Sequence, residues 1–163
     1  MAYHEQKNYQ RKGLTTAIIQ AGLLAGTLDI LAAFTHFYIK TGKNPLLILR
    51  FIASAVFGKA AFEEGNSMLA IGLLLHYIIA FCWTILFFLL YPQIIALVKN
   101  KFVAAFFYGI IIWLAMNLLI LPMTKLPKPT LSLVPSITGA LILIVAIGVP
   151  VALLAKKYYA KRV

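Results

Sequence analysis

Four apolar runs, each long enough to cross a bilayer, constrain the fold of this chain most strongly. They cover residues 14–39, 67–90, 102–121 and 136–155. About 20 apolar residues in a helix cross a hydrocarbon core of about 30 Å. With 63% of its 163 residues hydrophobic and 12% charged, the chain is too apolar for a soluble domain. We predict an all-α membrane protein: a single integral membrane domain, residues 1–163, forming an antiparallel four-transmembrane-helix bundle.

A shorter apolar segment, residues 45–62, lies between the first two spans. Leu46 to Phe57 is apolar except for Arg50 and Ser54. It is too short to cross a membrane, and Arg50 would be stranded in lipid. Segments of this length form interfacial or re-entrant helices. We therefore predict an extra interfacial or re-entrant helix here, and the sequence leaves open which of the two it is. The charges disfavour a fifth span.

The basic residues predict the orientation of the bundle. With four spans, both termini and the link between the second and third spans share one side. That side holds nine basic residues, Lys7, Arg11, Lys12, Lys99, Lys101, Lys156, Lys157, Lys161 and Arg162. The other side holds six, Lys40, Lys43, Arg50, Lys59, Lys125 and Lys128. This bias predicts cytoplasmic termini.

The net charge of +11 does not indicate a nucleic-acid partner. The basic residues lie in short segments between apolar runs, as expected for contact with lipid headgroups. We expect Arg50, Lys59, Lys156 and Lys157 to make such contacts. The lipid bilayer is therefore the first predicted partner.

The first span carries an aspartate, Asp29, near its middle. A charged side chain at the bilayer centre costs about 2.5–3.5 kcal/mol on insertion scales, so it is kept for function or for a partner. Helical spacing places five residues on one face, Gly22, Gly26, Asp29, Ala33 and His36. The G-x-x-x-G pair of Gly22 and Gly26 lets another helix backbone approach closely. We expect this face to point inward, with the glycines as helix-packing residues.

Three roles are open for Asp29 at this level. It joins helices as a protonated or hydrogen-bonded acid, it contacts a proton, an ion or a substrate, or it meets a countercharge from a partner subunit. In the second case, neighbouring polar residues complete the site. Antiparallel spans place His36, His76 and Asn117 in the outer half of the membrane, with Glu63 and Glu64 on the same side. With Asp29, these are the candidate substrate- or proton-binding residues.

Motifs for catalysis and for cofactors are not found in the sequence. It contains no G-x-S-x-G, no P-loop, no dinucleotide fingerprint, no H-E-x-x-H and no paired cysteines. The single cysteine, Cys82, lies in an apolar run and is interpreted as a small apolar residue. We predict no catalytic residue, no metal site and no cofactor, and we disfavour an enzyme.

Several features resemble the YagU-like group of small, largely uncharacterised bacterial inner-membrane proteins. They are Gly22 to Gly26 in the first span, His76 in the second, Tyr91 and Pro92 after it, and Gly109 and Pro122 in and after the third. The resemblance implies a bacterial inner-membrane location and no established activity. The group has a Glu and a Gly-His pair around its last span, where this chain has Ser136, Thr138 and Gly139.

Three functional hypotheses follow. The first is a structural or accessory subunit of a membrane assembly, or a homo-oligomer, which implies other membrane subunits or self-association as partners. The second is a small proton- or ion-linked transporter that uses Asp29, His36 and His76. The third is a redox subunit with metal or haem at the histidines.

Overall fold

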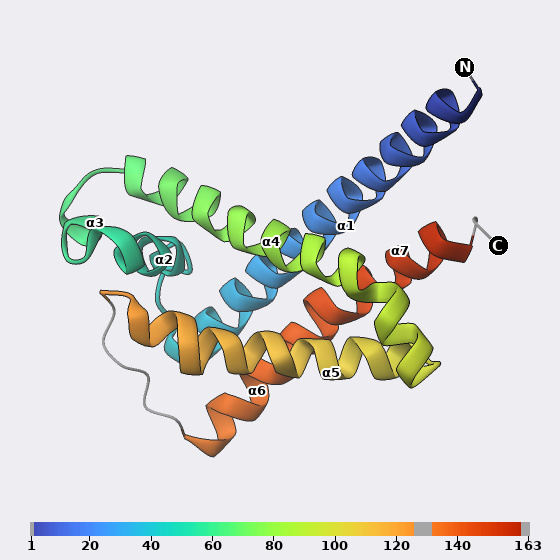
Figure 1. Ribbon diagram of the computed structural model, residues 1–163. Coiled ribbons are helices and arrows are strands. Elements are labelled where there is room, and N and C mark those ends of the chain that lie inside the picture. Colours follow the sequence, from blue (N-terminus) through green and yellow to red (C-terminus); the bar gives the residue numbers. More distant parts are fainter. Residues whose placement is uncertain (1, 126–131, 161–163) are drawn as a thin grey trace.

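The structure, a computed structural model, describes residues 2–125 and 132–160, with side chains from residue 13 on. In this part of the chain, four long apolar helices pack together and a shorter helix lies between the first two (Figure 1). The predicted four-helix bundle is therefore confirmed. Some basic side chains counted above lie outside the described side chains: Lys7, Arg11, Lys12, Lys128, Lys161 and Arg162.

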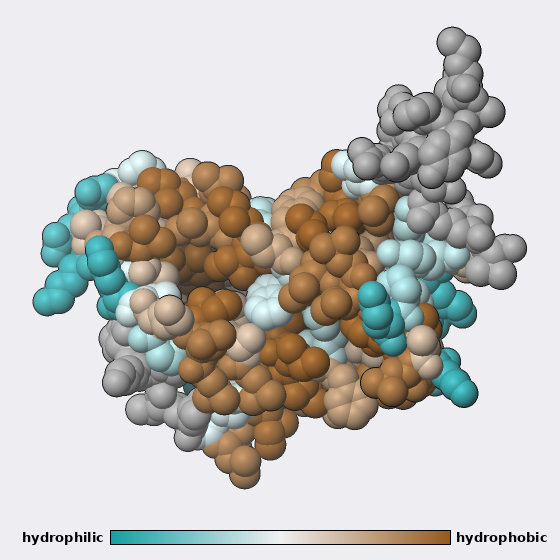
Figure 2. All heavy atoms as spheres, in the orientation of Figure 1, coloured by the Kyte–Doolittle hydropathy of each residue, from teal (hydrophilic) through white to brown (hydrophobic). Residues whose placement is uncertain are grey.

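The four spans run a few residues past the apolar runs that predict them. They cover Gly13–Thr41, Ser67–Val98, Lys101–Met123 and Leu133–Ala160 in the described chain. The first span belongs to α1 (Ala2–Thr41), which at 40 residues extends beyond the bundle, and the second is α4 (Ser67–Val98) (Figure 1). Figure 2 shows an apolar belt between two hydrophilic zones. By helix length and composition, the chain is a multi-pass membrane protein.

The third and fourth spans are each interrupted by a π-helical turn. The third consists of α5 (Lys101–Leu114), the π turn η1 (Ala115–Ile120) and the 3₁₀ turn η2 (Leu121–Met123). The fourth consists of α6 (Leu133–Leu143), the π turn η3 (Ile144–Gly148) and α7 (Val149–Ala160). Both π turns closely precede a proline, Pro122 or Pro150. Local π geometry is one way in which membrane helices satisfy backbone groups that a proline frees.

A two-residue link joins α4 to α5. Lys99 adopts the left-handed conformation with φ 54° and ends α4. The side-chain oxygen of Asn100 accepts from the backbone N–H of Phe102 over 2.8 Å and so caps α5. This tight reversal makes the two helices antiparallel. The start of α1 and the end of α7 lie at the same end of the bundle as this link (Figure 1).

Pro92 lies inside α4, which bends towards its C-terminal end and continues to Val98 (Figure 1). Proline has no N–H, so the carbonyl of Phe88 loses its helical partner. The hydroxyl of Tyr159 in α7 donates to that carbonyl over 2.8 Å. A side chain of the last helix therefore compensates for the proline of the second span.

The hydrophobic core lies in the half of the bundle nearer the termini. Its largest fully buried apolar side chains are Phe87 and Phe88 of α4, Ile112 of α5 and Val151 of α7. Alanines bring the helices close, and Ala21, Ala25 and Ala155 are fully buried. Gly148 lies against the backbone carbonyl of Ala105, so α5 and the fourth span approach without intervening side chains.

The shorter helix α2 (Leu47–Phe57) docks against the first half of α4. At Gly72 the backbone of Leu49 lies so close that a Cβ atom would overlap its carbonyl group. The backbone N–H of Lys125 also donates to the carbonyl oxygen of Ala55 over 3.2 Å. The extra helix between the first two spans is confirmed, and its depth in the membrane stays a prediction.

Arg50 joins α2 to the single-turn helix α3 (Ala60–Glu63). Its guanidinium donates to the carbonyl oxygens of Ala61 over 2.9 Å and Glu64 over 2.7 Å. A third bond reaches the carbonyl oxygen of Gly65 over 3.4 Å. Arg50 therefore satisfies carbonyls at the end of α3, a structural role that the sequence analysis did not anticipate for a predicted headgroup ligand.

Candidate functional site

The glycine face of α1 packs against α4. A Cβ atom added to Gly22 would overlap the ring of Phe81, and one added to Gly26 would meet the ring of Tyr77 at 2.9 Å. The contacts are with aromatic side chains, whereas the G-x-x-x-G pattern suggested an approach between backbones. Small residues on α1 thus accommodate large rings on α4. The residue order, 22 beside 81 and 26 beside 77, shows that the two helices are antiparallel.

Two hydrogen bonds fix the register between α1 and α4. His76 is buried, and its Nε2 lies 2.8 Å from the carbonyl oxygen of Gly26. Because a carbonyl oxygen only accepts, Nε2 carries the proton and donates. At the next residue of each helix, the hydroxyls of Thr27 and Tyr77 lie 2.8 Å apart. These bonds hold α1 to α4 without using Asp29.

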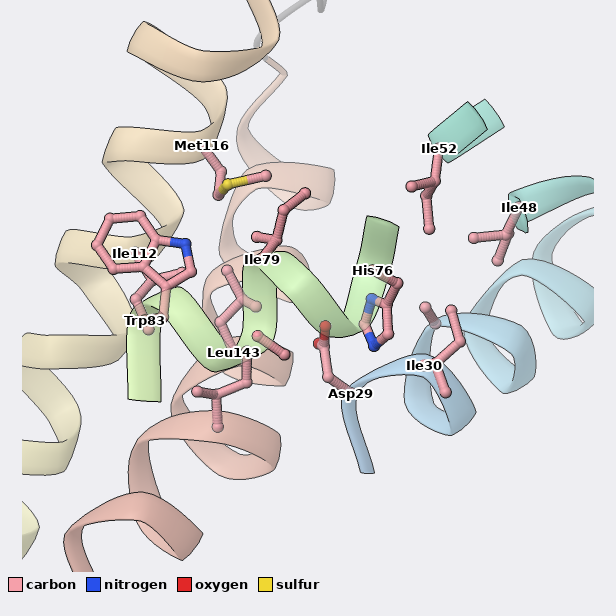
Figure 3. A pocket seen from close by; sticks show the side chains of 13 residues that line it. Asp29, Ile30, Ile48, Ile52, His76, Ile79, Trp83, Ile112, Met116 and Leu143 are labelled. Carbon is pink, nitrogen blue, oxygen red and sulfur yellow. The ribbon is translucent and has the colours of Figure 1, made fainter. Parts of the chain in front are cut away.

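A cavity of about 200 Å³ lies beside this contact, between α1, α2, α4 and the third and fourth spans. Figure 3 shows Asp29 of α1 beside His76 of α4, with Trp83 farther along α4. The charged or titratable side chains of its lining are Asp29 and His76, and most of the rest is aliphatic, including Ile30, Ile48, Ile52 and Ile79. Both interrupted spans contribute, through Met116 of η1 and Ile147 of η3. Such π turns are frequent at functional sites.

The Asp29 carboxylate has no hydrogen bond or ion pair with any residue that the structure describes, and it interacts electrostatically with the neighbouring His76. It is half-buried and faces the cavity. Within the described lining, no Lys or Arg supplies a countercharge. The arrangement is an acid and an imidazole at an otherwise apolar cavity inside a membrane-spanning bundle.

The other candidate residues do not line this cavity. His36 lies near the far end of the α1 face, and Glu63 and Glu64 are exposed at the end of α3. The amide of Asn117, in η1, donates to the carbonyl oxygen of Trp113 over 2.9 Å. The structure thus brings together two of the six candidates, Asp29 and His76. The headgroup role of Lys59, Lys156 and Lys157, which are exposed, stays a prediction.

The sequence analysis did not predict that α2 and Trp83 line the cavity. The spacing of His76, Ile79 and Trp83 places them on one face of α4, which is a signal that the sequence contains. The wall from α2 has a weaker signal, the spacing of Ile48 and Ile52. It depends on how α2 docks at Gly72, which no local pattern specifies.

No group of three or more His, Cys, Asp or Glu side chains is placed to hold a metal ion among the described residues. His36 is not among the residues that line the cavity with His76. The hypothesis of metal or haem at the histidines therefore gains no support from this geometry. No family model, curated protein or solved structure matches the chain.

Proposed function

We propose that this four-span membrane protein is a small proton- or ion-linked transporter. In this proposal Asp29 either carries the transported proton or is the counter-ion of a transported cation. One observation supports this above all: the Asp29 carboxylate faces a cavity within the bundle beside His76 and makes no hydrogen bond or ion pair with the described residues. Acidic side chains within membrane spans mark proton and substrate pathways. His76, beside it, is the second titratable group of the site.

The contacts between α1 and α4 favour this role over a purely structural acid. A carboxyl group that joins helices needs a donor or acceptor on the facing helix. Here the bonds from His76 to Gly26 and between Thr27 and Tyr77 join the two helices. Asp29 takes part in neither bond, so its unfavourable burial within the membrane is not explained by a role in joining these helices.

Proton flux into proteoliposomes tests the proposal. Vesicles containing the purified chain and a pH-sensitive dye receive a potassium diffusion potential, and the initial rate of internal pH change is measured. We expect Asp29→Asn to abolish the protein-dependent flux. Glu63→Gln is the matched control, because it makes the same change at an exposed acid, and it should leave the flux unchanged. Equal flux from wild type and Asp29→Asn would refute the proposal.

A second proposal is an accessory subunit or a homo-oligomer of a bacterial inner membrane, with both termini in the cytoplasm. It is supported by the length of α1, a helix that extends beyond the other helices (Figure 1). The excess of basic residues at that end supports the orientation. Cross-linking in native membranes, followed by purification in mild detergent, tests it: recovery of a single uncross-linked chain would contradict it.

A further inference from the structure

We propose that the cavity binds a small organic ammonium ion with a compact apolar body. This inference rests on the proposed function, because it names the solute class that the Asp29 site would carry. It follows from three properties of the lining: its charge, its hydrogen-bonding capacity and its size.

The charge of the lining selects a cation. Asp29 is its acidic residue, and the described lining contains no Lys or Arg. An ammonium group in the cavity would be the missing partner of the carboxylate. An anion would meet a like charge in an apolar environment, where repulsion is poorly screened.

The polar atoms near Asp29 are acceptors. The proton on Nε2 of His76 is committed to the carbonyl oxygen of Gly26 over 2.8 Å. In the neutral imidazole, Nδ1 is then an acceptor, and it bonds to no atom of the described chain. An ammonium group has several N–H donors, so it can donate to the carboxylate oxygen and to the imidazole nitrogen at the same time. The indole of Trp83, which has an N–H donor, lies apart from Asp29 along the cavity (Figure 3).

The rest of the cavity suits hydrocarbon and disfavours a bare metal cation. An apolar cavity of about 150 Å³ accommodates benzene, and this cavity measures about 200 Å³. One ring or a branched chain therefore fits among Ile48, Ile52 and Ile79. Inorganic cations such as Ca²⁺ or Mg²⁺ need about six oxygen ligands, whereas the acidic lining offers a single carboxylate.

Three probes of nearly equal size test this inference on the full chain in detergent at neutral pH: benzylammonium, benzyl alcohol and benzoate. Trp113→Phe leaves Trp83 as the one remaining tryptophan of two, so its fluorescence reports on the cavity. We expect saturable binding of benzylammonium, about tenfold tighter than that of benzyl alcohol, because it adds charge-assisted hydrogen bonds. Benzoate should not bind.

The Asp29→Asn variant provides the matched control. It should weaken benzylammonium binding by about tenfold and leave benzyl alcohol binding unchanged, since only the charged contact is lost. Glu63→Gln should change neither. Thermal stabilisation of the chain with both tryptophans gives a second measurement by the same probes, which keeps the test valid if Trp113→Phe does not fold.

The failures of the two proposals are distinguishable. Equal binding of benzylammonium and benzyl alcohol, or no binding of any probe, would overturn the ammonium inference even if proton flux depends on Asp29. Selective binding of benzylammonium that Asp29→Asn abolishes would support the inference, and it would do so even if proteoliposomes show no flux that depends on Asp29. In that case Asp29 binds the ammonium ion and carries no protons, and the proton-linked form of the transporter proposal is wrong.

Discussion

The hydroxyl of Tyr159 donates to the carbonyl oxygen of Phe88, the residue four positions before Pro92. The last helix thereby satisfies an acceptor that the proline of α4 leaves without an N–H. The hydrogen bond between α7 and α4 thus compensates for the N–H that Pro92 lacks. This relationship allows a stability test with a built-in control.

Tyr159→Phe should lower the stability of the bundle by about 0.6–2 kcal/mol, the range for hydrogen bonds between membrane helices. Thermal unfolding in detergent measures the loss. In a Pro92→Ala background the alanine N–H bonds to Phe88 again, so the same substitution should cost less. An equal cost in both backgrounds would show that the bond does not compensate for the proline.

Asp29→Leu should raise the unfolding midpoint, because it removes an acid that makes no hydrogen bond with the described residues from a mostly apolar cavity. For a chain of this length, each kcal/mol gained corresponds to about 2–4 °C. Glu63→Leu, at an exposed position, should leave the midpoint unchanged. A lower midpoint for Asp29→Leu would instead favour the hypothesis of an acid that joins helices.

Gly72→Ala should displace α2 from α4, since the new Cβ atom would overlap the carbonyl group of Leu49. Overpacking of this kind costs about 1–3 kcal/mol. Amide hydrogen exchange over Leu47–Phe57 measures the effect, and exchange should become faster there. Gly65→Ala, where a Cβ atom meets nothing within 4 Å, is the control; equal exchange in both variants would argue against this packing.

Arg50→Gln should loosen α3, because the shorter side chain no longer reaches the carbonyl oxygens of Ala61 and Glu64. Since water replaces part of the loss at this exposed end, we expect a cost of about 1 kcal/mol. Amide exchange at residues 59–66 should become about fivefold faster. Lys59→Gln changes a neighbouring exposed charge and should have no such effect; unchanged exchange in Arg50→Gln would contradict the assigned role.

The fold was largely predictable because apolar run length specifies membrane helices almost alone. The ends of the helices were less predictable. The helix α4 continues through Pro92 to Val98, and the hydroxyl of Tyr159 in α7 donates to the carbonyl oxygen that the proline leaves without a partner. The π turns were not predicted, although Pro122 and Pro150 mark their positions. Proline indicates where a helix is disturbed and does not specify which geometry replaces it.

The candidate site was predictable in part, for a similar reason. Asp29 stands out because a lone acid in an apolar run is visible in any sequence, and His76 stands out in the same way. Their proximity depends on the register between α1 and α4, which the fit of Gly26 against Tyr77 fixes. His36 and Asn117 are also polar residues within apolar runs, but neither of them lines the cavity.

The π turn η3, Ile144–Gly148, also determines which side of α7 faces the core. Each residue turns an α-helix by about 100°. A π turn takes up about one residue more than an α turn, so winding the same residues as an ordinary α-helix would rotate everything downstream by about that angle. Val151, Ala152 and Ala155, all buried, would then swing towards the acyl chains. The π turn therefore sets the rotation of the last helix, and losing one residue within it would restore ordinary winding with the buried side of α7 still facing the core.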